Sequence, residues 1–360
     1  MRSRLLGTRA ATRVVFSVLL VVGWRPSLAA AQSPGAPEAS QASHSQPASQ
    51  PEARFDYRVG PLADLWLYVR ANAAERAGSK APPEFDAAIA AAKTLDAQLG
   101  GHVLMWAPLD LALLTCRTAA ELKRFVEDLP EAIPARGGRT LAIRSEALAL
   151  ADALVAVERV HRERVWPEHK AALRAALRRI DQQFRPKEAA CVRYMLASLA
   201  MADPGGAVPV VLVSEAPWPG AYTVGRPAGA VACFVSVLRD QHAGTWLFET
   251  ILHEATHAFD LRTQESGSVL IALREKLRAA GVGPADRDLR DIPHTIMFIQ
   301  AGETIRRFVD PGHEHYGDAA GLYERSQRIV DVERPAWLAY LDGKQDREAT
   351  IERIVRELRP

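Results

Sequence analysis

His253, Glu254 and His257 have the residue types and the spacing of a metal-dependent hydrolytic site. They lie in the run His253-Glu254-Ala255-Thr256-His257, where the two histidines are four residues apart. Four residues turn a helix by about 40° beyond a full turn, so both imidazoles lie on one face and can bind one ion. Glu254 projects about 100° away, where it can reach a water on the ion rather than the ion itself. Because neutral imidazole is a good zinc ligand, the pattern predicts a zinc site with Glu254 as the general base.

The residues around this motif predict a buried helix. Apolar side chains dominate Trp246 to Leu252 on one side and Ala258-Phe259 on the other, and Thr245 is suited to cap the first turn. Two histidines and a glutamate in such a helix are costly unless a partner compensates them, and a bound metal ion does so. A helix with satisfied core histidines is the simpler alternative, and the complete motif favours the metal.

Over this helix, the strand-like stretch before it and a second helix after it, the chain resembles the zincin metallopeptidases. The resemblance is local to these segments. It implies a small twisted sheet packed on the active helix, with an edge strand that holds an extended substrate backbone by strand addition. It also implies a peptide or protein substrate and one zinc ion (Zn²⁺) per chain.

A third protein ligand is needed to complete a catalytic zinc site. Asp260 and Thr263 stand where one zincin class, the metzincins, has glycine and a histidine or aspartate, so that class is excluded. The gluzincin class instead uses a glutamate from a downstream helix. Glu303 fits this role, because it lies in an apolar turn and follows Gly302, which lets another helix approach closely. His294 is the rival ligand. It lies nine residues earlier, about half a turn round the same helix, so only one of the two can face the ion.

Two acidic residues are placed to support the histidine ligands from behind. Asp260 lies about one turn after His257 and can accept its second ring N–H, and Glu249 can do the same for His253. Both residues also have an ordinary interpretation as surface side chains. The sequence leaves these two interpretations open.

Further histidine and tyrosine side chains are candidates for stabilising an oxyanion. If Glu303 is the ligand, His294 can instead donate to the developing oxyanion or close a loop over the site. His313, His315 and Tyr316 form a polar cluster after the second helix, from which Tyr316 can serve the same purpose. A solvated loop is the favoured interpretation of this cluster.

The first 31 residues have the pattern of a secretory signal peptide. Arginines precede an apolar stretch from Val14 to Trp24, which is short for a membrane span, and Ala29-Ala30-Ala31 supplies a cleavage site before Gln32. An uncleaved anchor is the alternative. Residues 32–54 are rich in Ala, Ser, Pro and Gln and predict a disordered linker. The mature protein is therefore expected to be secreted or periplasmic, without a transmembrane segment.

The pattern of predicted helices and strands divides the rest of the chain into a helical region, 55–205, and a zincin-like metal-binding region, 206–360. Helices are expected at Pro61 to Ala77, Glu84 to Leu99, Ala119 to Leu129, Arg139 to Trp166 and Glu188 to Met201. Pro167 is expected to interrupt the fourth of these, with a basic helix continuing through Arg179. His161 and His169 fall on helix faces that are predicted to be solvated. Strands are expected at Val208 to Ser214, Ala221 to Val224 and Ala230 to Val237, followed by helices at 246–259, at 268–280, from Pro293, and near 320–342 and 345–358. The predicted fold class is mainly α with a small β-sheet (α+β).

Charge and cysteine content exclude some classes of protein. The full chain has a formal charge of +2, and removal of the five arginines in the first 31 residues leaves −3. This balance lacks the excess of positive charge that is typical of proteins that bind nucleic acid. The three cysteines, Cys116, Cys191 and Cys233, have no ligand-like spacing. One disulfide with a buried thiol, or three buried thiols, are the alternatives, and Cys233 lies in an apolar stretch typical of a core.

The sequence thus predicts an exported zinc metallohydrolase, and a peptidase in particular, with His253, His257 and Glu303 as metal ligands. Two alternatives remain open. One is a non-catalytic surface or periplasmic binding protein, in which His294 or His313 would close a four-ligand zinc site. The other is a zinc hydrolase of non-peptide amides or esters. Nothing in the sequence indicates the oligomeric state.

Overall fold

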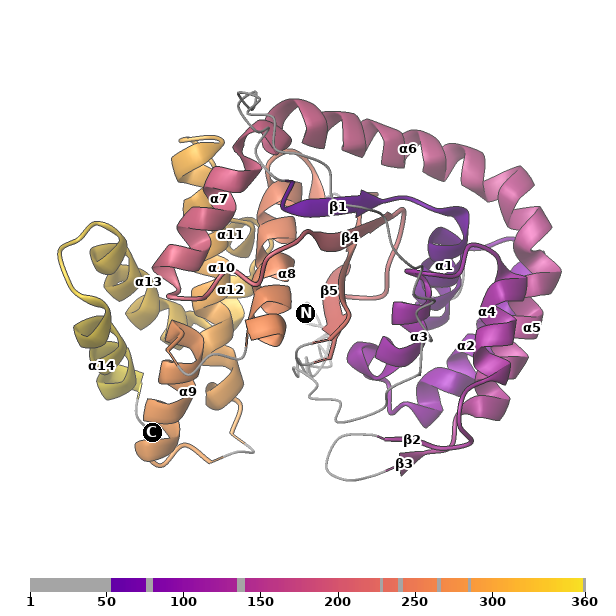
Figure 1. The fold of residues 1–360 in the computed structure, drawn as a ribbon, viewed down its shortest axis with the longest axis horizontal. Helices are drawn as coiled ribbons and strands as arrows, with labels where there is room; N and C mark the ends of the chain where they lie inside the picture. The colour runs from indigo at the N-terminus through magenta and orange to yellow at the C-terminus, as the bar shows by residue number, and fades with distance from the viewer. Residues whose placement is uncertain are drawn as a thin grey trace, which may run out of the picture.

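The computed structural model describes residues 53–75, 80–134, 140–226, 229–238, 242–263, 267–283 and 286–358. The predicted signal peptide and almost all of the predicted linker lie outside the described residues. Within these residues, helices dominate and a small mixed sheet lies at the centre, so the predicted fold class is confirmed (Figure 1). None of the helices in the described part of the chain has the length and hydrophobicity of a bilayer-spanning segment.

The central sheet has four strands in the order β1-β4-β6-β5. They are β1 (Phe55–Arg58), β4 (Val208–Val213), β5 (Ala221–Gly225) and β6 (Val231–Ser236). The pairs β1·β4 and β4·β6 are parallel, whereas β5 runs antiparallel to β6 and forms one edge. The three predicted strands are confirmed. The fourth, β1, was not predicted, because its four residues carry only a short and mixed pattern.

Strand β1 is held at the opposite edge by contacts with the helical region. The carboxylate of Glu188 accepts hydrogen bonds from the backbone N–H of Arg54 (2.6 Å) and Phe55 (2.9 Å). The hydroxyl of Tyr57 donates to the other oxygen of Glu188 at 3.2 Å. These contacts fix β1 beside β4, although the two strands are far apart in the sequence.

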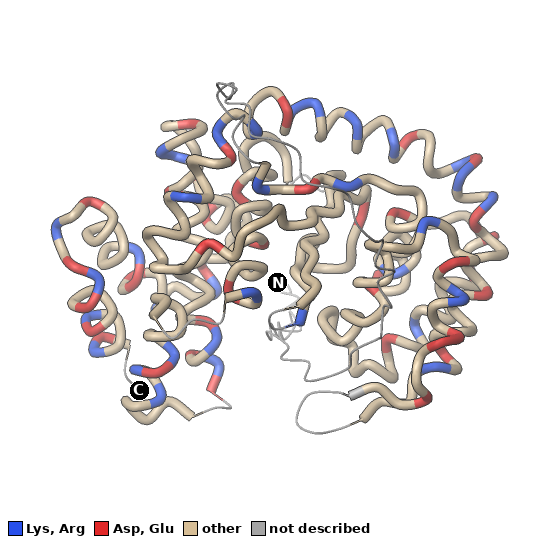
Figure 2. Tube along the Cα trace, in the orientation of Figure 1, with Lys and Arg blue, Asp and Glu red and all other residues tan. Residues whose placement is uncertain are grey.

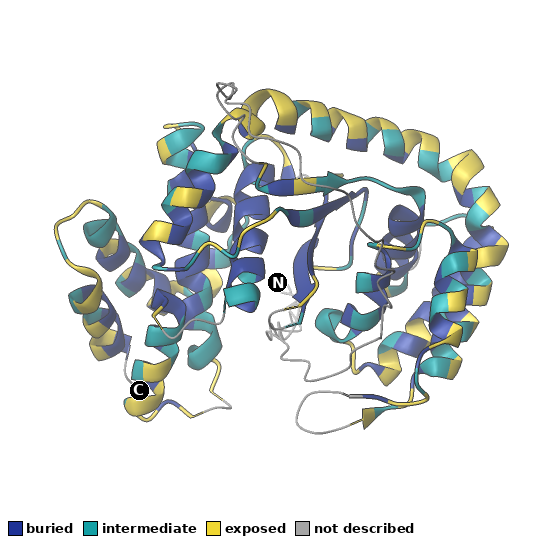
Figure 3. Cartoon of the chain, viewed as in Figure 1, coloured by how far each residue is buried: buried dark blue, intermediate teal, exposed yellow. Residues whose placement is uncertain are grey.

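The sheet is buried on both faces. Along β4, Val210 and Leu212 pack with the carboxy-terminal helices, whereas Val211 and Val213 pack with the amino-terminal helices. This alternation follows from the two-residue period of a strand, and burial on both faces explains the nearly continuous apolar sequence. The molecule therefore has three layers, with the sheet in the middle (Figure 3).

The amino-terminal layer consists of helices joined by short turns. They are α1 (Pro61–Ala74), η1 (Pro83–Phe85), α2 (Asp86–Gln98), η2 (Val103–Trp106), α3 (Ala107–Ala112), α4 (Ala119–Glu127) and α5 (Arg144–Val160), with a short ladder of β2 (Ile133–Pro134) and β3 (Thr140–Leu141). A long arc, η4 (His161–Val165), α6 (Trp166–Arg179), η5 (Ile180–Phe184) and α7 (Arg185–Ser198), then crosses the top of the molecule (Figure 1). Basic residues recur along α6, in contrast to the mostly uncharged sheet (Figure 2).

The arc differs from the expected helix in one respect. Pro167 does not interrupt it, because this proline lies in the first turn of α6, where its missing N–H is tolerated. The irregularities are instead two π-helical turns, η4 and η5. Each π turn contains one residue more than an α turn, so it shifts the phase of the side chains that follow.

The carboxy-terminal layer contains the remaining helices. They are α8 (Trp246–Thr263), α9 (Val269–Ala279), α10 (Asp288–Phe308), α11 (Tyr316–Ala319), α12 (Leu322–Arg325), α13 (Gln327–Leu341) and α14 (Arg347–Leu358). The expected start of α10 at Pro293 is wrong, because the helix begins at Asp288 and contains this proline. Cys116, Cys191 and Cys233 are all free thiols, and the last two are buried.

Candidate metal centre

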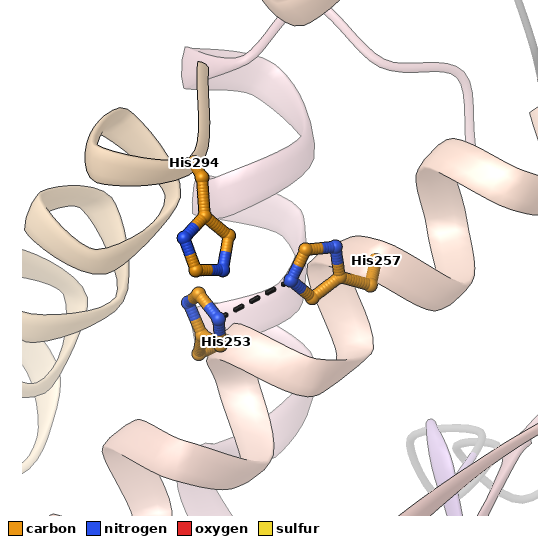
Figure 4. Close-up of side chains that lie close together, drawn as sticks. All are labelled: His253, His257 and His294. Carbon is orange, nitrogen blue, oxygen red and sulfur yellow. Dashed lines mark hydrogen bonds between the residues drawn. The ribbon is translucent and has the colours of Figure 1, made fainter. Parts of the chain in front are cut away.

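Two helices bring three histidines together beside the sheet. His253 and His257 project from the same side of α8, and His294 approaches them from the first part of α10 (Figure 4). His253 is buried, whereas His257 and His294 are partly exposed. The cluster therefore lies at the boundary between the buried core and the surface.

The spacing of the imidazoles fits a shared metal ion. The Nε2 atoms of His253 and His257 are 3.2 Å apart, and one ring nitrogen of each of the three residues lies within 4.8 Å of the others. Two nitrogens on one tetrahedral zinc ion would be about 3.3 Å apart, given Zn–N bonds of about 2.0–2.1 Å. The Nδ1 atom of His253 is buried and has no hydrogen-bond partner among the described residues, and its ring stacks on Phe298 at 3.7 Å between centroids.

The surroundings keep the three imidazoles neutral. Burial lowers the pKa of His253 well below its ordinary value, and the neighbouring His257 and His294 lower it further. Burial is likewise the main cause of the lowered pKa of His257 and of His294, and nearby Arg274 acts in the same direction on both. Because only the neutral ring can bind a metal, the site holds its ligands in the form that coordination requires.

The structure brings His294, rather than Glu303, to His253 and His257. Oε1 of Glu303 lies 2.9 Å from Nε2 of His315 and 3.2 Å from Arg306. Burial acts to raise the pKa of Glu303, but His315 and Arg306 outweigh it and hold the pKa below its ordinary value. The two candidates lie on opposite sides of α10, as expected from their spacing, and α10 turns the His294 side towards α8.

Gly302 has a packing role that differs from the predicted one. It was expected to let a neighbouring helix approach, but a Cβ atom at this position would lie 2.6 Å from the ring of His315. The glycine thus makes room for an imidazole that pairs with the next residue, Glu303. This is a structural reason for both residues that requires no metal.

Glu254 is held by the edge strand. The hydroxyl of Thr223 in β5 lies 2.7 Å from Oε2 of Glu254 and 2.8 Å from its backbone oxygen. Burial raises the pKa of Glu254 to about 8, and the hydrogen bond from Thr223 opposes this shift. A carboxyl group with a pKa near neutrality is suited to accept and return a proton.

Thr223 was missed in the sequence, although a signal for it was present. It is the polar residue between Tyr222 and Val224, and these neighbours face the other side of the sheet, in the amino-terminal core. Strand alternation alone would therefore have placed its hydroxyl towards α8. What the sequence did not show was that the carboxylate of Glu254 would lie opposite this position.

The two acidic residues expected to support the histidines have other partners. Oδ2 of Asp260 accepts a hydrogen bond from Arg274 at 3.1 Å. Oε2 of Glu249 lies 2.6 Å from Nε2 of His313 and accepts the backbone N–H of Tyr316 at 2.8 Å. Glu249 is thus bound to the segment after α10 rather than to His253.

The segment with His313, His315 and Tyr316 is buried, so its interpretation as a solvated loop is wrong. The hydroxyl of Thr245 also contacts Nδ1 of His313 at 2.7 Å. The ring of Tyr316 lies 5.9 Å from that of His242, between centroids. These contacts join the segment to the start of α8, and the expected oxyanion role of Tyr316 stays a prediction.

Comparisons of the chain with protein-family models, with curated proteins and with solved structures found no match in any of the three. The chemistry of the site is therefore inferred from its own residues. Three neutral imidazoles and one adjacent carboxyl group are the components that the structure brings together.

Proposed function

We propose that this protein is a zinc-dependent metallohydrolase and that its substrates are peptides. The observation that carries the proposal is the convergence of His253, His257 and His294, with Glu254 next to the first of them in sequence and buried against β5. Three imidazoles leave one position of a tetrahedral ion open, which is the arrangement of catalytic rather than structural zinc. When bound, zinc would polarise the scissile carbonyl and lower the pKa of a coordinated water to about 7.

The residues of the chain have separate tasks in this proposal. Glu254 accepts a proton from the attacking water and returns it to the leaving amine. Thr223 donates a hydrogen bond to Oε2 of Glu254, and Oε1 would take the proton. The three histidines hold the ion, with His294 in place of Glu303.

The sheet favours peptides over small amides or esters as substrates. Strand β5 is the antiparallel edge strand, and its Thr223 contacts both the side chain and the backbone of Glu254. An extended peptide that paired with β5 would therefore pass close to the general base. A small ester would gain nothing from this edge.

A mixed peptide library tests the proposal. The zinc-loaded protein should cleave members of the library, and Glu254→Gln should keep the zinc while losing at least about a hundredfold in rate, because the amide cannot act as a base. Metal analysis of both proteins provides the control for correct folding. Full turnover by the variant would contradict the proposed mechanism, and cleavage of esters without any peptide product would redirect the substrate class.

A further inference from the structure

A second cluster of metal-ligating side chains lies in the other helical layer. Asp64 of α1 meets His161, the first residue of η4, and His169 of α6. Oδ2 of Asp64 is 3.1 Å from Nε2 of His161 and 2.7 Å from Nδ1 of His169. All three residues are buried, so the expectation that both histidines lie on solvated helix faces is wrong.

The π turn η4 explains how the two histidines come to share one carboxylate. His161 and His169 are eight residues apart, which would place them about 80° apart around a regular α-helix. The extra residue of the π turn reduces the effective separation to seven residues, or about 20°. Insertions of this kind are rare and occur frequently at functional sites. Here the insertion aligns two imidazoles that a regular helix would separate.

The carboxylate of Asp64 is oriented by the sheet. Its Oδ1 atom accepts hydrogen bonds from the backbone N–H (2.8 Å) and the hydroxyl (2.6 Å) of Ser214, which follows β4. Oδ2 is thereby directed at the two imidazoles. Outer partners that fix one oxygen of a carboxylate are typical of metal ligands. Nδ1 of His161 has no hydrogen-bond partner among the described residues, so the polar contacts shown for this ring lie on its Nε2 side.

We propose that Asp64, His161 and His169 form a second binding site for a divalent transition-metal ion. Two histidines and one carboxylate are a known ligand set for such ions. Adjacent ligands of a six-coordinate ion with bonds of about 2.1 Å lie about 3.0 Å apart, and the two oxygen–nitrogen distances from Asp64 lie on either side of this value. Because its ligands come from α1 and from the arc, and Ser214 orients one of them, the ion would join both to the sheet.

The number of metal ions per chain tests this proposal directly. Chelator-stripped protein is loaded with Zn²⁺, and in parallel with Co²⁺, then dialysed and analysed for metal. We expect two ions per chain in the wild type, one in His253→Ala/His257→Ala and one in His169→Gln. The triple variant, which combines these three substitutions, should bind none. The double variant isolates the second site, so a failure of the catalytic proposal and a failure of this one give different results.

A binding-linked stability measurement covers the case in which His169→Gln folds poorly. Zn²⁺ at about a hundredfold excess over its Kd should raise the Tm of His253→Ala/His257→Ala by about 5 °C. The same addition should leave the Tm of the triple variant unchanged. No bound ion in His253→Ala/His257→Ala, or no Zn²⁺-dependent shift of its Tm, would overturn the proposal and leave Asp64 as a hydrogen-bonded anchor only.

Discussion

The two histidine clusters differ in how their polar atoms are satisfied. On α8 and α10, three imidazoles face one another with no carboxylate among the three, and two of them are partly exposed. On α1 and the arc, a single carboxylate is surrounded by two imidazoles and Ser214, and all of these residues are buried. In the first cluster the Nε2 atoms of His253 and His257 contact each other at 3.2 Å, whereas the second is stabilised by a carboxylate that both of its imidazoles share.

The pKa shifts of the histidines in the first cluster and of Asp64 in the second reflect the same difference. Burial lowers the pKa of each histidine in the first cluster, and their mutual proximity adds to the effect for His253 and His294. For Asp64, burial acts to raise the pKa, but contacts with His161, His169 and Ser214 outweigh it and hold the pKa well below its ordinary value. We infer that the first cluster serves to bind a ligand, whereas the second both binds a ligand and stabilises the fold.

The largest effect is expected from removing the centre of the second cluster. In metal-free protein, Asp64→Ala should lower the free energy of unfolding by about 3–5 kcal/mol, because both imidazoles and Ser214 lose a buried charged partner. Urea denaturation measures the change. His257→Ala is the matched control and should change stability by less than about 1 kcal/mol, because its ring is partly exposed. Equal losses would remove the distinction between the clusters.

The next largest effect concerns the third ligand of the first cluster. His294→Ala should weaken Zn²⁺ binding by more than about a hundredfold, because loss of a ligand exceeds the 10–100-fold effect of an outer partner. Glu303→Ala should weaken it by less than about tenfold, because Glu303 is bound to His315 and Arg306. Competition with a chelator compares the two variants. The reverse order would restore the arrangement predicted from the sequence.

A smaller effect should follow from the pH dependence of stability in metal-free protein. The pKa of Glu254 is raised from 4.5 to about 8, so its ionisation destabilises the folded state increasingly as pH rises through this window. Glu254→Gln should therefore be more stable than the wild type by about 2 kcal/mol at pH 6, with almost no difference at pH 4. Thermal unfolding between pH 4 and 9 in the presence of a chelator measures it. A constant difference across this range would exclude the linkage to Glu254.

The smallest effect is expected at Thr223. Thr223→Val should reduce kcat by about tenfold with little change in KM, because the general base loses the hydroxyl that orients it. Thr223→Ser keeps the hydroxyl and should retain activity within about twofold. Steady-state kinetics on a cleaved library peptide would separate the two. If serine is as impaired as valine, the methyl group of Thr223 matters rather than its hydrogen bond.

Local patterns in the sequence predicted a large part of the molecule. The spacing of His253 and His257 depends only on helix geometry, so their convergence could be foreseen from five letters. Strands β4, β5 and β6 were predicted because their apolar runs are bounded by Gly and Pro residues. Each of these features is decided within a few residues.

Features that depend on distant contacts could not be predicted in the same way. The choice between His294 and Glu303 depends on which side of α10 faces α8, and each residue taken alone is a reasonable ligand. His161 and His169 were misplaced because a regular helical period was assumed where the chain makes a π turn. Glu249 was misplaced because its partner, His313, lies in a segment that carries no local signal of burial.

The position of β1 at the edge of the sheet has a consequence for folding. Phe55 pairs with Val208, and the entire amino-terminal helical layer lies between them in sequence. During synthesis from the amino terminus, β1 emerges first but has no strand to pair with until β4 follows. Such long-range contacts slow folding, since a long loop must close before they form. We therefore expect the helical layer to assemble early and β1 to join the sheet late. The hydrogen bond from the backbone N–H of Phe55 to Glu188 would then be among the last contacts to form.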